Sequence, residues 1–252
     1  MAGAFGLWLM LGSVAAPSFA APLPETVQKI KPSIVGVGTF SATRRPPAKL
    51  TGTGFVVGDG RHVLTSAHVL PKSLDRQRKE TLAVIVVGKS VRVRSARLVE
   101  SDTAHDVALL KFDGQALPAL RLGDASQVRE GELYAFTGFP IGTVLGFKPV
   151  THRGIVSAIT PIAIPRSSTK SLNAAALKRL NAPYDVFQLD ATAYPGNSGS
   201  PLYRPQDGKV IAILNMVFVK SSKENILSQP SGISYAIPIQ YARALMRKAG
   251  LR

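Results

Sequence analysis

Residues 194–201 of this chain read Tyr194-Pro195-Gly196-Asn197-Ser198-Gly199-Ser200-Pro201. The glycines on either side of Ser198 let the backbone turn tightly and keep side chains away from the serine hydroxyl. Backbone N–H groups in such a turn can converge on a developing oxyanion. The pattern alone is weak, because Gly-x-Ser-Gly turns are also common in ordinary loops. Ser198 is therefore a candidate nucleophile that needs support from the rest of the chain.

Two upstream segments supply the partners that a serine nucleophile requires. A serine hydroxyl reacts poorly at neutral pH unless a base lies within hydrogen-bond reach and an acceptor orients that base. The candidate base is His68, in Thr65-Ser66-Ala67-His68-Val69, and the candidate acceptor is Asp106, which opens an apolar run. The chain order His68, Asp106, Ser198 is one of those in which such triads occur.

Other polar residues fit these roles less well. Asp102 is the rival acid, but it lies in a turn-like segment and no apolar strand follows it directly. His62, His105 and His152 lack the Ser-Ala-His context, so we expect them to be surface or strand residues. On an extended segment, the side chains of His105 and Asp106 would point to opposite faces.

With these residues the chain resembles the trypsin-fold serine proteases, and among them the bacterial HtrA/DegP-like branch. The matching segments are collinear with the family and lie at residues 52–57, 65–69, 106–110, 138–142, 154–157, 195–199 and 235–238. The resemblance runs from about Pro24 to the C-terminus. A collinear series is far more specific than any one motif in it.

The resemblance implies an all-β fold of two antiparallel six-stranded β-barrels (trypsin-like) with a C-terminal helix. A composition with 22 glycines and 18 prolines suits such a turn-rich β protein. We expect the trypsin-like serine protease domain at 21–252, with an N-terminal barrel at about 25–124 and a C-terminal barrel at about 130–252. Strands are expected at 33–37, 53–57, 62–65, 82–87, 91–98, 106–112, 132–138, 150–159, 186–189, 210–219 and 234–237.

Two helices are expected at the ends of this domain. A short one covers residues 25–31, and a closing helix covers residues 238–250. In the closing helix the apolar residues that face inward would be Ile239, Ala242, Leu245 and Met246.

The function implied by the resemblance is a serine endopeptidase that hydrolyses peptide bonds through an acyl-enzyme. The backbone N–H groups of Gly196 and Ser198 would form the oxyanion hole. Asn197 replaces the acid with which digestive relatives bind a newly cut N-terminus, so no activating cut beyond signal removal is expected. Ser200 stands where the family motif has glycine, and its side chain could alter the oxyanion-hole backbone.

Substrate contacts are expected on both sides of the serine. Thr192 and Ala193 would lie at the base of the specificity pocket, where the absence of an acid disfavours lysine or arginine before the cleaved bond. Small or medium apolar residues are the expected preference. Leu214, Asn215 and Met216 would form the edge that pairs with the substrate backbone, unless they belong to a plain core strand.

Two other functions remain open at this point. The chain could be a catalytically silent trypsin-fold binding protein, or an esterase that uses the same three residues. No cofactor and no metal is expected, and polypeptides are the expected substrates. The PDZ modules of many HtrA-like proteins are expected to be missing. Trimers are frequent among these relatives, so an oligomer is compatible with the resemblance.

The first twenty residues are expected to be a signal peptide. An apolar run covers residues 4–16, and Ser18-Phe19-Ala20 fits a small-x-small cleavage site. No lysine or arginine precedes the run, so retention as an anchor is the alternative. No other stretch approaches membrane-spanning length. The expected location is the bacterial periplasm or the medium.

The remaining composition restricts partners and chemistry. The formal net charge is +16, which would attract anionic partners such as acidic polypeptides or lipid headgroups. A solvated basic surface explains the same charge, and we favour it. The sequence shows no long basic helix and no aromatic residues interleaved with basic ones, so specific nucleic-acid binding is not expected. The chain has no cysteine, which excludes disulfides, zinc–cysteine sites and a thiol nucleophile.

Overall fold

The two six-stranded antiparallel barrels expected from the sequence are confirmed. The computed structural model describes residues 23–88, 90–141, 147–162, 183–215 and 232–251. The first barrel consists of β1 (Ile34–Phe40), β2 (Ala48–Val57), β3 (His62–Ser66), β4 (Thr81–Val87), β5 (Val91–Asp102) and β6 (Val107–Phe112). The second consists of β7 (Leu133–Gly138), β8 (Val150–Pro161), β9 (Asp185–Asp190), β10 (Pro201–Tyr203), β11 (Val210–Asn215) and β12 (Ile233–Pro238).

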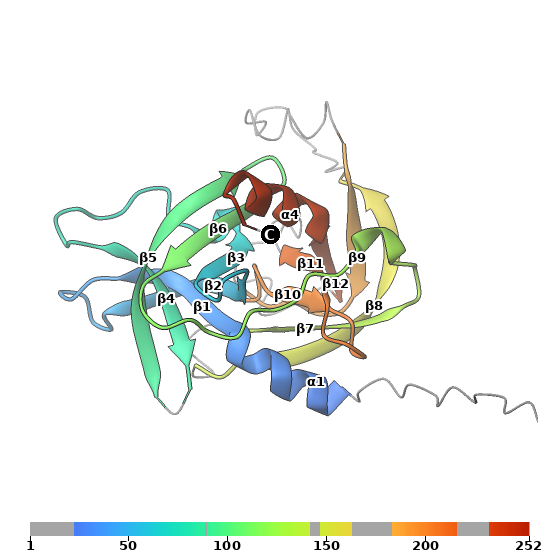
Figure 1. Ribbon diagram of the computed structural model, residues 1–252, viewed down its shortest axis with the longest axis horizontal. Coiled ribbons are helices and arrows are strands. Elements are labelled where there is room, and N and C mark those ends of the chain that lie inside the picture. Colours follow the sequence, from blue (N-terminus) through green and yellow to red (C-terminus); the bar gives the residue numbers. More distant parts are fainter. Residues whose placement is uncertain (1–22, 89, 142–146, 163–182, 216–231, 252) are drawn as a thin grey trace, which may run out of the picture.

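Both barrels are closed by hydrogen bonds between strands that are distant in sequence. The first has the order β1-β2-β3-β6-β5-β4 and the second the order β10-β11-β12-β9-β8-β7. In Figure 1 the first barrel lies on the left and the second on the right. One apolar core cluster contains Ile34, Phe55 and Leu64 from the first barrel together with residues of the second. The junction between the barrels is therefore itself a packed core.

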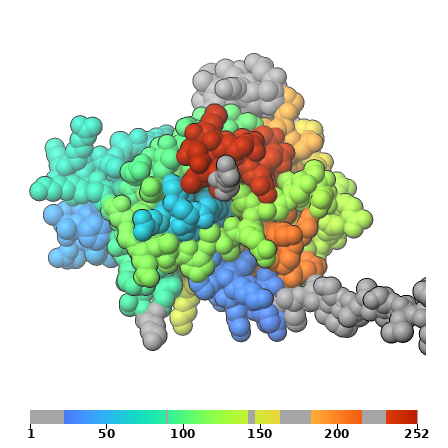
Figure 2. Space-filling model, in the orientation of Figure 1, coloured from blue at the N-terminus to red at the C-terminus, as the bar shows by residue number. Residues whose placement is uncertain are grey.

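Two helices cover the junction from outside. α1 (Leu23–Ile30) precedes β1, and α4 (Ile239–Lys248) follows β12. As expected, α4 buries Ile239, Ala242, Leu245 and Met246, which share one helix face. Figures 1 and 2 show α4, in red, lying between the two barrels on the front of the molecule.

The strand predictions need three corrections. β10 was missed, because three residues that begin with a proline carry no readable alternation. Asp106 was placed in a strand, whereas it lies in a turn before β6 with φ +57°. The strand predicted at 91–98 continues to Asp102 as β5, and its residues Val91 and Val93 are 46% and 38% exposed.

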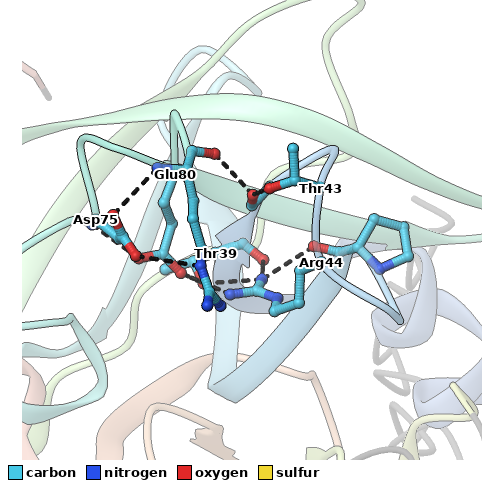
Figure 3. A network of polar contacts seen from close by, with 8 residues as sticks. Thr39, Thr43, Arg44, Asp75 and Glu80 are labelled. Carbon is cyan, nitrogen blue, oxygen red and sulfur yellow. Dashed lines mark hydrogen bonds and ion pairs between the residues drawn. The ribbon is translucent and has the colours of Figure 1, made fainter.

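A network of polar contacts joins the β1–β2 loop to the loop that follows His68 (Figure 3). Glu80 Oε1 accepts hydrogen bonds from Thr39 Oγ1 and Arg44 Nη1, both at 2.6 Å, and Oε2 accepts from the backbone N–H of Asp75 at 3.1 Å. The hydrogen bonds from Thr39, Asp75 and Arg44 lower the pKa of Glu80 to about 2. The Glu80 carboxylate is therefore ionised at neutral pH and keeps these hydrogen bonds.

The signal-peptide prediction for residues 1–20 lies outside the described residues. So do the expected strand positions after Asn215, Met216 among them. Within the described ranges, no helix has both the length and the apolar character needed to cross a membrane.

Candidate active site

His68 lies where the first barrel faces the second. It follows β3 in the 3-10 turn η2 (Ala67–Val69), and backbone hydrogen bonds tie this turn to Asp106. The N–H of Ala67 donates to the carbonyl of Asp106 at 3.1 Å, and the N–H of His68 donates to Asp106 Oδ1 at 2.8 Å. The backbone thus positions the imidazole beside the carboxylate.

A continuous hydrogen-bond chain joins Asp106, His68 and Ser198. His68 Nδ1 lies 2.6 Å from Asp106 Oδ2, and His68 Nε2 lies 2.9 Å from Ser198 Oγ. An ionised carboxylate only accepts hydrogen bonds, so Nδ1 carries the proton and Nε2 is left to accept the serine hydroxyl. The His68 side chain is 32% exposed and that of Asp106 is 7% exposed. The imidazole of His68 therefore meets solvent, while the carboxylate beside it is buried.

Asp106 owes its direction to an uncommon backbone conformation and to a partner on the second barrel. Its φ of +57° lies in the left-handed region, which residues with a side chain seldom adopt. Its Oδ2 also accepts a hydrogen bond from Asn215 Nδ2 at 2.6 Å. Asn215 is fully buried at the end of β11. The carboxylate therefore lies within hydrogen-bond distance of three nitrogen donors, two on His68 and one on Asn215.

The turn before Ser198 has the features of a type II turn. The N–H of Asn197 donates to the carbonyl of Tyr194 at 2.9 Å, with Pro195 and Gly196 between them. Gly196 has φ +100°, as the third position of a type II turn requires. The carbonyl of Pro195 accepts from the N–H of Ile141 at 2.6 Å. Because the two groups of a trans peptide point in opposite directions, the Gly196 N–H points away from Ile141.

Two backbone donors in this turn have no backbone acceptor among the residues that the structure describes. Neither the N–H of Gly196 nor that of Ser198 donates to a backbone carbonyl within the described part of the chain. Backbone N–H groups that lack a partner bind water or a ligand. Both donors lie in the short segment that carries the Ser198 hydroxyl.

Thr53 of β2 fastens this turn to the first barrel. Its N–H donates to the carbonyl of Ser198 at 2.9 Å, and its Oγ1 donates to the carbonyl of Gly196 at 2.7 Å. Gly199 has φ +88°, and a Cβ there would overlap the Thr53 carbonyl oxygen and Thr65 Oγ1. Only glycine fits such a close approach between the two barrels.

Asn197 and Ser200, which lie on either side of Ser198 and Gly199 in the chain, are buried. Both are fully inaccessible to solvent, and their side-chain polar atoms have no hydrogen-bond partner among the residues described. A Cβ on Gly138 would overlap Ser200 Oγ, so the glycine makes room for the serine. The type II turn therefore coexists with a side chain at position 200.

The expected substrate residues lie in different environments. Thr192 is half-buried and Ala193 is 6% exposed. Leu214 is buried, its carbonyl accepts from the N–H of Gly199, and its N–H donates to the carbonyl of Ser200, both at 2.9 Å. Its backbone groups thus already have partners within the protein. Of the predicted substrate-pairing edge, Asn215 and Met216 then remain. The Asn215 side chain donates to Asp106, and Met216 lies outside the described residues.

Two functional contacts were not foreseen from the sequence. The hydrogen bond from Asn215 to Asp106 had one readable signal, because Asn215 is a polar residue inside the apolar run that begins at Val210. The support of the serine turn by Thr53 had none, since a threonine between two strand glycines is unremarkable in sequence. In the described residues, no group of three or more histidine, aspartate or glutamate side chains is arranged to hold a metal.

The ring of His152 lies near that of Tyr194, the first residue of the turn before Ser198. Its ring stacks on Phe136 with centroids 5.0 Å apart and lies at 6.4 Å from the ring of Tyr194. Its Nε2 is buried and has no partner among the described residues. Burial lowers the pKa of His152, because the charged imidazolium would lose its hydration.

This burial predicts an acid-sensitive stability. The folded protein holds His152 neutral below the ordinary histidine pKa of about 6.5, so the unfolded chain binds the proton more readily. The free energy of unfolding is expected to fall as the pH drops below about 6.5. In His152→Phe that part of the dependence should be absent. Urea unfolding of both proteins at about pH 7.5 and about pH 5.5 checks this. An equal loss of stability in the two proteins would contradict it.

Comparison with known sequences places these residues in a wider context. The model of the trypsin-like peptidase domain matches residues 52–213. The chain is 33% identical over 191 residues to a "Probable periplasmic serine endoprotease DegP-like" of Halomonas elongata, which covers 76% of this chain and 33% of the relative. A protein of the same name from Pseudomonas putida (strain W619) is 32% identical over 204 residues. This match covers 79% of this chain and 34% of the relative. The chain thus spans about a third of these curated relatives.

Solved structures with the same fold include two proteases. An HtrA-type protease AlgW with a tripeptide superimposes with a TM-score of 0.64 and 28% identity, over 90% of this chain and 63% of that one. A serine endoprotease from Yersinia pestis gives a TM-score of 0.62 and 25% identity, over 91% of this chain and 66% of its own.

Proposed function

Because the chain belongs to the trypsin-like peptidase family, we propose that it is a serine endopeptidase that works through Ser198, His68 and Asp106. The observation that carries the proposal is the hydrogen-bond chain from Asp106 Oδ2 through His68 to Ser198 Oγ, with steps of 2.6 and 2.9 Å. These distances lie within the reach that a general base needs. The relatives named serine endoproteases support the same activity.

In the first half-reaction His68 acts as base and then as acid. Ser198 Oγ attacks the carbonyl carbon of the substrate, while its proton moves to His68 Nε2. The resulting imidazolium is stabilised by Asp106, which holds the Nδ1–H. His68 then gives the proton to the leaving amine, the C–N bond breaks, and an acyl-enzyme ester remains on Ser198.

In the second half-reaction water takes the place of the amine. His68 removes a proton from the water molecule, whose oxygen attacks the ester carbon. The bond from that carbon to Ser198 Oγ breaks, and the serine recovers its proton from His68. The His68 side chain is 32% exposed, so water can reach the ring.

The N–H groups of Gly196 and Ser198 are the proposed oxyanion hole. Both lack a backbone acceptor within the described residues, and the Pro195–Gly196 peptide directs its N–H away from Ile141. One such donor is worth about 3–4 kcal/mol of transition-state stabilisation. We infer that this hole is formed before the substrate binds, since the type II turn already has the required Gly196 conformation.

The proposed substrates are polypeptides cleaved after small or medium apolar residues. Thr192 and Ala193 carry no charge that could pair with lysine or arginine in the pocket. A digest of a peptide library, read by mass spectrometry, would give the preferred residue directly. A preference for lysine or arginine would overturn this specificity.

We also propose that the chain is exported to the bacterial periplasm. Residues 4–20 have the apolar run and the small-x-small site of a signal peptide. The curated relatives are named periplasmic endoproteases. Asn197 is uncharged, so activity should not require an activating cut downstream of Ala20. N-terminal sequencing of active protein recovered from the periplasm tests both points.

A fluorophosphonate label tests the catalytic proposal itself. The reagent should attach to Ser198 of the folded wild-type protein, as shown by peptide mapping, and should not attach to heat-unfolded protein. A folded protein that remains unlabelled would support the silent binding protein instead. A protein that is labelled but cleaves only ester substrates would support the esterase.

A further inference from the structure

A second histidine–aspartate pair lies in the turn that leads into Asp106. Asp102 ends β5, and its Oδ1 accepts hydrogen bonds from the backbone N–H groups of Ala104 (3.0 Å) and His105 (3.1 Å). Its Oδ2 lies 2.6 Å from His105 Nδ1. A single carboxylate thus holds the segment just before Asp106 at three points.

The same histidine joins this turn to the second half of the molecule. Its ring stacks on Tyr241 of α4, with centroids 3.8 Å apart and planes at 15°. It also lies 4.6 Å from the ring of Tyr184, which directly precedes β9. Tyr184 and Tyr241 pack edge to face at 5.1 Å. His105 is therefore held by the second barrel and by the C-terminal helix.

The turn carries a backbone conformation that needs support. Asp106 has φ +57°, and such a conformation persists in a residue with a Cβ only where surrounding contacts impose it. The direction of the Asp106 carboxylate toward His68 Nδ1 and Asn215 Nδ2 depends on that φ. A turn that relaxed to negative φ would swing the carboxylate away from both donors.

The Asp102 carboxylate is suited to this role because it stays ionised. Burial raises the pKa of Asp102, but hydrogen bonds from the side chain and backbone of His105 and from the Ala104 N–H outweigh burial, and the pKa lies below its ordinary value. At neutral pH the group is then an acceptor for all three donors.

We propose that Asp102 and His105 are positioning residues, which hold Asp106 in its left-handed conformation by clamping the preceding turn to Tyr241 of α4. The inference rests on the proposed peptidase activity of Ser198, His68 and Asp106. It assigns the pair no contact with substrate. Its effect passes only through the direction of the Asp106 carboxylate.

The test separates the stacking of His105 on Tyr241 from its hydrogen bond to Asp102. His105→Ala removes the ring and the donor, His105→Phe keeps a ring for stacking on Tyr241, and His105→Asn keeps a donor near the position of Nδ1. The kcat of His105→Ala for a peptide substrate should fall at least about tenfold with little change in KM, since small displacements of catalytic groups are costly. His105→Phe and His105→Asn should each recover part of the loss. The rate of Ser198 labelling by a fluorophosphonate should follow kcat.

A matched control exists in the same barrel. His62 Nδ1 pairs with Asp59 Oδ1 at 2.7 Å with the same sequence spacing, but His62 is at the opposite end of β3 from His68. His62→Ala should leave kcat per folded molecule unchanged, although its melting temperature falls. A merely structural His105 would behave in the same way.

The possible outcomes distinguish this inference from the proposed function. Wild-type protein that neither cleaves nor labels refutes the function. If the wild-type protein is active and a folded His105→Ala variant has the same kcat and the same labelling rate, the positioning role of Asp102 and His105 is refuted and the proposed function stands. If His105→Ala does not fold, Asp102→Asn takes its place, because in either orientation its NH₂ group faces an N–H donor from which it cannot accept, while the shape is kept. An unchanged kcat in Asp102→Asn would equally overturn this positioning role.

Discussion

Replacement of Ser198 by alanine is expected to lower kcat for a peptide substrate by about 10⁶-fold, as loss of a nucleophile does in serine proteases that use the same three side chains. The change removes the only atom that can form the acyl-enzyme. The oxyanion-hole donors belong to the backbone and remain, so a small residual activity above that of water should persist. Steady-state kinetics over a wide range of enzyme concentration measures the ratio.

A double variant makes this prediction sharper. Nucleophile and base act as one unit, so Ser198→Ala/His68→Ala should be no slower than Ser198→Ala alone. The melting temperature of Ser198→Ala should match that of the wild type, since the His68 side chain is 32% exposed and water can replace the lost hydroxyl. A loss of less than about tenfold in the single variant would exclude Ser198 as the nucleophile.

Asp106→Asn should lower kcat by about 10⁴-fold with almost no change in shape. Oδ1 accepts from the His68 N–H, and Oδ2 accepts from His68 Nδ1 and Asn215 Nδ2. An asparagine places an NH₂ group against one of these donors in either orientation. When the NH₂ faces His68 Nδ1, the imidazole must carry its proton on Nε2 and can no longer accept the proton of Ser198.

The kinetic signature identifies this cause. KM should change little, because the substrate does not contact Asp106, and labelling of Ser198 should slow in proportion to kcat. Asp59→Asn is the matched control, since Asp59 pairs with His62 at 2.7 Å at the end of β3 that is remote from His68. An Asp106→Asn variant as active as Asp59→Asn would show that another group orients His68, and Asp102 would then be the first candidate.

Local patterns in the sequence predicted most of the strands and the closing helix, and the resemblance to the trypsin-fold proteases implied the two barrels. Alternating and apolar runs marked eleven of the strands that the structure describes, and the inward face of α4 was read from four apolar positions. These features could be predicted because burial imposes a short period on a strand or a helix. The three residues of the proposed triad were also named from the sequence, through the motifs in which each stands. The structure brings them within hydrogen-bond distance.

The tertiary structure alone decided how these residues are held. Ser198 and His68 are 130 positions apart, Thr53 and Gly196 are 143 apart, and Asn215 and Asp106 are 109 apart. No short period connects such pairs, because their contact depends on the register of two closed barrels and on the way the barrels pack. For the same reason the sequence suggested Asp102 as a rival acid and His105 as a surface or strand residue. In the structure, a hydrogen bond joins the two side chains next to Asp106, and His105 packs on Tyr241. The sequence alone therefore determined the two barrels and the residues that carry the proposed chemistry, and the contact between the barrels decided their geometry.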